Sequence, residues 1–111
     1  MTQEQNIEVS KQGQKQGIKL NSEGNIYQYF TKKGYNIIQG KLLTGESGTP
    51  DFFCRKDDND KFFVEVKDKA GNLTMAQVNW MSECNDKVYV SMEDYSGNII
   101  FYEMEIKKVK L

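Results

Sequence analysis

Apolar and polar positions along the chain change their spacing several times, and helical spacing comes first, in residues 21–35, NSEGNIYQYFTKKGY. Ile26 and Phe30 lie one helical turn apart there, an Asn or Ser can cap the start, and Gly34 can end the helix. Glu23 precedes Ile26 by three residues, so we expect it on the same face as Ile26 and Phe30 rather than on the solvent face.

Short runs rich in β-branched and aromatic residues predict five strands. They are YNIIQ (35–39), DFFCR (51–55), KFFVEVK (61–67), KVYVS (87–91) and NIIFYEM (98–104). Residues 40–50 are expected to form a glycine-bearing loop, and KDDND (56–60) a turn that makes a hairpin of its two flanking strands. A second helix is predicted over residues 74–85, where Thr74 and Gln77 fit a capping box.

The order α-β-β-β-α-β-β predicts an α/β (α+β) fold with a mixed central sheet flanked by helices. A chain of 111 residues is the size of one domain, which we place at residues 21–111. Residues 1–20 are rich in Gln, Lys and Gly without a clear period, so they predict a flexible N-terminal arm that could contain a short strand at IEVS (7–10).

Composition narrows the chemistry. No apolar run approaches the roughly 20 residues of a membrane helix and no secretory signal is visible, so we expect a soluble cytoplasmic protein with no membrane partner. The chain has no histidine, which excludes His-ligated zinc, Ser-His-Asp triads and a His general base. Cys54 and Cys84 are expected to be free, half-buried thiols. The net charge of −1 is not that of a generally basic nucleic-acid binder.

Candidate chemistry lies in residues 61–67. Side chains alternate along a strand, so Glu65 and Lys67 share one face near its C-terminal end, and the proposed hairpin brings Asp51 to the same edge of the sheet. Crowded carboxylates need a cation between them or a proton on one of them. Mg²⁺ satisfies this need with one or two carboxylates, several waters and phosphate oxygens, and Lys67 could orient a water or stabilise negative charge.

Each residue alone also has an ordinary structural interpretation. Glu65 and Lys67 could be a surface ion pair, Glu23 could only favour the helix dipole, and Gln77 could only complete the capping box. The combination is more specific: an Asp, then Glu-x-Lys on the following strand, with a helical Glu before and a helical Gln after.

These residues resemble a known family. The segments GTPD (48–51), VEVK (64–67) and GNLT (71–74), followed by Gln77, look like the VRR-nuclease branch of the PD-(D/E)xK nuclease superfamily. Archaeal-type Holliday junction resolvases share the superfamily core and are near relatives. The resemblance covers about residues 21–91 and implies a restriction-endonuclease-like core.

The resemblance implies a metal site. Asp51 and Glu65 would bind Mg²⁺ or Mn²⁺, the backbone carbonyl of Val66 would be a further ligand, and Glu23 would support the site from the first helix. It also implies that Lys67 is the catalytic lysine and that Gln77 acts beside it.

The function expected from this resemblance is a divalent-metal-dependent endonuclease that hydrolyses DNA phosphodiester bonds, with selectivity for branched or flapped structures. The small size of the domain favours a homodimer. The alternatives are a Holliday junction resolvase, a non-catalytic DNA-binding subunit with the same fold, and a structural domain with surface ion pairs. Ser47 resembles a loop serine of the resolvases, which is a weak match.

Overall fold

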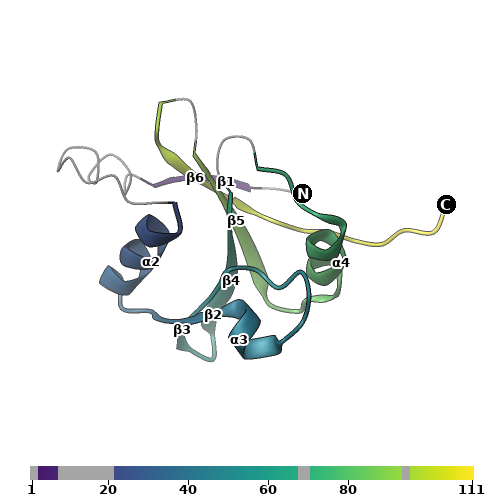
Figure 1. Cartoon of the computed structure of the whole chain (residues 1–111), viewed down its shortest axis with the longest axis horizontal. Coiled ribbons are helices and arrows are strands. Elements are labelled where there is room, and N and C mark those ends of the chain that lie inside the picture. The colour runs from purple at the N-terminus through teal and green to yellow at the C-terminus, as the bar shows by residue number, and fades with distance from the viewer. Residues whose placement is uncertain (1–2, 8–21, 68–70, 94–95) are drawn as a thin grey trace.

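The computed structural model describes residues 3–7, 22–67, 71–93 and 96–111, and it shows one mixed sheet with helices on both faces (Figure 1). The elements, in chain order, are β1 (Gln3–Ile7), α2 (Ser22–Lys32), β2 (Asn36–Gln39), α3 (Gly40–Thr44), β3 (Phe52–Asp57), β4 (Asp60–Lys67), α4 (Met75–Glu83), β5 (Lys87–Glu93) and β6 (Ile99–Glu103). Within these described ranges, no helix combines the length and apolarity needed to cross a membrane.

The sheet has six strands in the order β1-β6-β5-β4-β3-β2. β4 and β5 are parallel and are joined through α4, whereas every other neighbouring pair is antiparallel. The predicted hairpin of β3 and β4 is present, with Phe52 opposite Val64 and Cys54 opposite Phe62. The expected mixed sheet flanked by helices is therefore confirmed.

The α2 face of the sheet carries an aromatic core. Ile26 and Phe30 of α2 are buried against Phe62 and Val64 of β4 and Phe101 of β6. The Phe30 ring lies edge-on to Phe62 and Phe101, with centroid distances of 5.1 and 5.6 Å, which is the favourable geometry for aromatic rings. Even-numbered residues of β4 thus face α2, as the strand alternation predicts.

The α4 face carries a second core. Phe63 of β4 packs with Met81 of α4 and with Val88 and Val90 of β5. Trp80 lies edge-on to Phe63 at 4.8 Å between ring centroids. Both faces of β4 and β5 are therefore covered, and these two strands lie at the centre of the molecule.

Two described elements were not in the predicted order. The first half of the expected loop at 40–50 is the short helix α3, whose Leu42 and Leu43 are exposed, so the run has no buried face that its sequence could reveal. The second is β1, a polar segment that pairs with β6 from Gln3 opposite Glu103 to Ile7 opposite Ile99. The rest of the N-terminal arm predicted for residues 1–20 lies outside the described residues.

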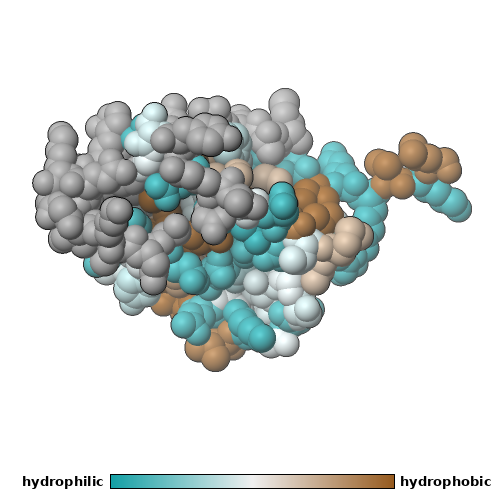
Figure 2. All heavy atoms as spheres, turned by 45° about the horizontal axis from the view of Figure 1, so that its top comes forward, coloured by the Kyte–Doolittle hydropathy of each residue, from teal (hydrophilic) through white to brown (hydrophobic). Residues whose placement is uncertain are grey.

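Apolar side chains also reach the surface at the C-terminal end of the chain. Val109 and Leu111 are exposed, and the segment that carries them extends away from the body of the molecule (Figures 1 and 2). Before that point the chain is tied to the domain: Met104 donates a backbone hydrogen bond to Val88, and Lys108 forms an ion pair with Glu83.

Candidate active site

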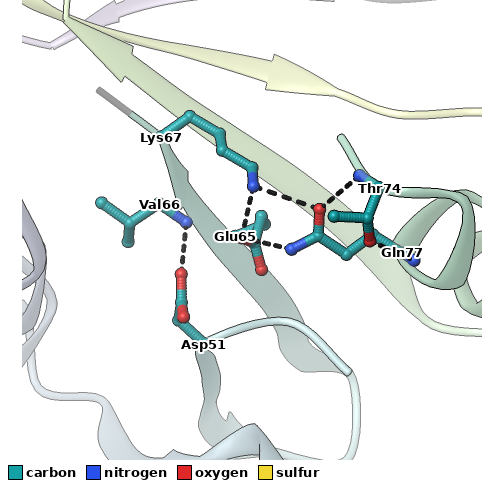
Figure 3. Close-up of polar contacts among 6 residues, drawn as sticks. All are labelled: Asp51, Glu65, Val66, Lys67, Thr74 and Gln77. Carbon is teal, nitrogen blue, oxygen red and sulfur yellow. Dashed lines mark hydrogen bonds and ion pairs between the residues drawn. The ribbon is translucent and has the colours of Figure 1, made fainter. Parts of the chain in front are cut away.

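The site begins where the β3–β4 ladder ends. The last paired residue of β3 on this side is Phe52, whereas β4 continues to Lys67. At the preceding residue, the Asp51 side chain replaces the backbone as the hydrogen-bond acceptor. Its Oδ2 accepts a hydrogen bond from the backbone N–H of Val66 at 2.8 Å (Figure 3). This bond fixes one oxygen of the Asp51 carboxylate against β4.

Glu65 and Lys67 project from the α4 face of the same strand end (Figure 3). Glu65 is 4% exposed, and its Oε2 lies 3.3 Å from Lys67 Nζ, whose side chain is 15% exposed. The predicted convergence of Asp51, Glu65 and Lys67 at one sheet edge is thus present. Glu65 and Lys67 do not form a surface ion pair, because both side chains are largely buried.

Gln77 of α4 joins this cluster through both ends of its amide. Its Nε2 donates to Glu65 Oε2 at 2.8 Å, and its Oε1 accepts from Lys67 Nζ at 3.1 Å. The same Oε1 also accepts from the backbone N–H of Thr74 at 2.9 Å, while Thr74 Oγ1 accepts from the Gln77 N–H at 3.1 Å. Gln77 therefore completes the capping box and also contacts Glu65 and Lys67, and its part in catalysis stays a prediction.

Burial changes the acidity of Glu65. Desolvation, and next the charge of Asp51, raise the pKa of Glu65 from 4.5 to about 7, although the ammonium of Lys67 lowers it. Burial and the nearby charge of Asp51 thus both disfavour the ionised form of Glu65, and Lys67 offsets only part of their combined effect. A proton or a further cation stabilises the arrangement.

The donor set suits a hard divalent cation. Asp51 and Glu65 offer carboxylate oxygens, and Mg²⁺ or Mn²⁺ can bind through one or two carboxylates while keeping several waters. No group of three or more His, Cys, Asp or Glu side chains is arranged as a metal site in the part of the chain described here. These residues thus fit an ion that takes its remaining ligands from water or phosphate, and the part predicted for the Val66 carbonyl stays a prediction.

Glu23 departs from its predicted position. It is exposed, although Ile26 on the same helix is fully buried. The reason is that helical spacing sets the direction of a side chain but not how far the core extends, and Glu23 lies in the first turn of α2, at the edge of the core. It lines an open cavity that also reaches Asp51, so its predicted contribution to the metal site stays a prediction.

The loop before Asp51 is packed against the start of α4, which its glycine content did not by itself predict. Gly48 has φ +84°, and a Cβ built on it would lie 2.2 Å from the carbonyl oxygen of Ala76. Trp80 Nε1 donates to Glu46 Oε1 at 3.4 Å across the same contact. Ser47 is exposed in this loop. The contact holds Asp51 in a fixed relation to Gln77.

The cysteines take no part in the site. Cys54 is fully buried, not half-buried as expected, and Cys84 is half-buried; both are free thiols. Desolvation raises the pKa of Cys54 to about 12 and raises that of Cys84 as well. Neither supplies a thiolate nucleophile at neutral pH.

Comparison with known proteins supports the interpretation of this geometry. A family model described as the VRR-NUC domain matches residues 3–96, a range that includes β1 and every residue of the cluster. Among curated proteins, none matches the chain.

Proposed function

Because the chain belongs to the VRR-NUC domain family, a PD-(D/E)xK nuclease-type family, we propose that it is an endonuclease that hydrolyses DNA phosphodiester bonds with a divalent metal. The observation that carries the proposal is the connected cluster of Asp51, Glu65, Lys67 and Gln77 at one edge of the sheet. A protein that kept the fold only to bind DNA would not need two opposed carboxylates with a lysine beside them.

Asp51 and Glu65, with the Val66 carbonyl, would hold Mg²⁺ or Mn²⁺. When bound, the ion supplies positive charge at the phosphate and makes a water molecule more acidic. One carboxylate oxygen of Asp51 accepts a hydrogen bond from the Val66 N–H, so the orientation of the other oxygen is set before a metal binds. The chain therefore supplies preorganised ligands rather than flexible ones.

Lys67 would act on the reacting groups directly. Its ammonium is held between Gln77 Oε1 and Glu65 Oε2, and neutralisation of Glu65 by a cation would free it to donate to a phosphate oxygen or a water. Gln77 would hold both neighbours in place through its amide. Its predicted catalytic part is thus best described as positioning.

We further propose that the substrate is branched or flapped DNA and that the protein acts as a homodimer. A domain of 111 residues offers a small surface, and a second copy would supply a second site for the second strand. Light scattering at micromolar concentration tests the assembly, and a monomeric mass would contradict it.

The decisive experiment is cleavage of labelled linear, nicked, flapped and four-way DNA with Mg²⁺ or Mn²⁺. Lys67→Ala should abolish cutting, whereas Lys87→Ala, an exposed lysine on β5, should leave it unchanged. Symmetric cuts confined to four-way DNA would identify a Holliday junction resolvase. Absence of cutting by the folded wild type would refute the nuclease proposal.

Metal binding is measured separately by titration calorimetry with Mn²⁺. Asp51→Asn removes one carboxylate charge and should weaken binding strongly, whereas Glu83→Gln removes an exposed carboxylate of α4 and should not. Equal binding by wild type and Asp51→Asn would place the ion elsewhere.

A further inference from the structure

An open cavity of about 540 Å³ lies directly beside the candidate active site. Asp51 lines the cavity and also belongs to the cluster, so the cavity meets the candidate active site at this carboxylate. One wall comes from α2, with Glu23 and Tyr27, and the other from β2 and α3, with Gln39 and Lys41. Cavities of this size, within the range of about 300–1,000 Å³, hold single small ligands.

The two walls differ in chemistry. Tyr27 is 47% exposed, and its ring rests at an angle on Phe52 with 6.0 Å between centroids, so this residue supplies an aromatic group to the cavity wall. Lys41, which is exposed, contributes a positive charge on the opposite wall. Glu23 makes the α2 wall repel a phosphate, so a ligand with one phosphate and one flat ring would place its phosphate toward Lys41 and its ring toward Tyr27.

We propose that this cavity receives one unpaired nucleotide next to the phosphate that is cut, with its base stacked on Tyr27 and a flanking phosphate at Lys41. The inference rests on the proposed function and extends it by naming the feature of DNA that is selected. A base within a duplex is stacked between its neighbours, so only an unpaired base can place a face on the Tyr27 ring without first being unstacked. Flaps, gaps and junction branches supply the unpaired nucleotide that a continuous duplex lacks.

Binding is tested with 2-aminopurine, whose fluorescence is quenched when it stacks. DNA with a short flap carries this base at each successive unpaired position, and binding is followed in Ca²⁺, which shares the oxygen-ligand preference of the proposed metals. Wild type should quench one position most strongly and bind the flap more tightly than a nicked duplex. Tyr27→Leu should lose that quenching and weaken flap binding about 5- to 150-fold, which corresponds to the range for base–aromatic stacking.

Matched variants separate stacking from folding. Tyr27→Phe keeps the ring and should behave as wild type, and Gln28→Ala, an exposed neighbour on α2, should have no effect. Lys41→Gln lies on the exposed surface, so folding is not at risk, and it should lower the slope of log affinity against log salt by about 0.7. Lys32→Gln, at the far end of α2, is its control and should leave the slope unchanged.

The outcomes distinguish the two levels of the proposal. If wild type cuts DNA but binds nicked duplex as tightly as flapped DNA, or if Tyr27→Leu quenches like wild type, the nucleotide cavity is refuted and the nuclease stands. If wild type cuts no form of DNA, the proposed function fails, while position-specific quenching that depends on Tyr27 would still support the cavity as a nucleotide site.

Discussion

Replacement of Glu65 by glutamine should remove the loss of folding stability that the metal-free protein suffers when this buried carboxyl ionises. Glu65 is buried beside Asp51, and its pKa is raised from 4.5 to about 7. A carboxyl whose pKa is raised on folding stabilises the fold below its unfolded pKa, and this stabilisation is lost as pH rises through the folded pKa. The wild type should therefore lose stability between about pH 4.5 and pH 7, and Glu65→Gln should not show this loss.

The magnitude follows from the two pKa values. The gap between 4.5 and about 7 corresponds to about 3 kcal/mol, of which about 2.5 kcal/mol is lost between about pH 5 and pH 8. Domains of this size have free energies of unfolding of about 5–15 kcal/mol, so the effect is a substantial part of the total.

The assay is urea unfolding in EDTA at about pH 5 and pH 8, with wild type, Glu65→Gln and the exposed control Glu83→Gln. The difference between wild type and Glu65→Gln should shift by about 2.5 kcal/mol toward the variant at the higher pH, whereas Glu83→Gln should follow wild type. Added Mn²⁺ at about pH 8 should restore wild type more than Glu65→Gln. Parallel pH profiles for wild type and Glu65→Gln would refute the assignment of the repulsion to this carboxyl.

Three further substitutions test the supports of the site. Gly48→Ala places a methyl group against the Ala76 carbonyl and should lower the free energy of unfolding by more than about 2 kcal/mol. Gly45→Ala, at φ +70° but with open space around it, should lower it by only about 1 kcal/mol. Thermal melting compares the two variants, and equal losses would contradict the close contact at Gly48. Thr74→Ala should lower the free energy of unfolding by about 1 kcal/mol and slow DNA cleavage, because it removes the helix cap that also positions Gln77. Thr74→Ser should restore the stability and the cleavage rate. An unchanged cleavage rate in Thr74→Ala would show that the cap does not support the site. Phe30→Ala should cost about 3–5 kcal/mol in urea unfolding, and a loss under about 1 would show that its ring contacts add little.

Sequence patterns with a fixed spacing predicted their part of the fold correctly. The alternation in β4 placed Phe62 and Val64 on one face and Glu65 and Lys67 on the other, and the structure keeps that division. The capping box at Thr74 fixed the start of α4 at the correct residue. Such features depend on neighbours in sequence, so sequence alone contains them.

The features that the sequence did not predict depend on where the core and the strands end. The first turn of α2 reaches past the core, so Glu23 is exposed despite its helical spacing from Ile26. β3 begins at Phe52, so its pairing with β4 does not extend to the Val66 N–H, which the Asp51 side chain binds instead. β1 has a mostly polar sequence, and its strand is defined by its pairing with β6, which lies far away in the chain. None of these boundaries is encoded in local spacing.

The amide of Gln77 makes completion of the site depend on the docking of α4. Asp51, Glu65 and Lys67 leave the ribosome before α4, yet Lys67 and Glu65 reach their final partners only when the first turn of α4 forms and docks. A nascent or locally unfolded chain therefore carries the reactive side chains without their arrangement. If the chain cuts nucleic acid as proposed, this dependence restricts reactivity to molecules in which α4 has docked.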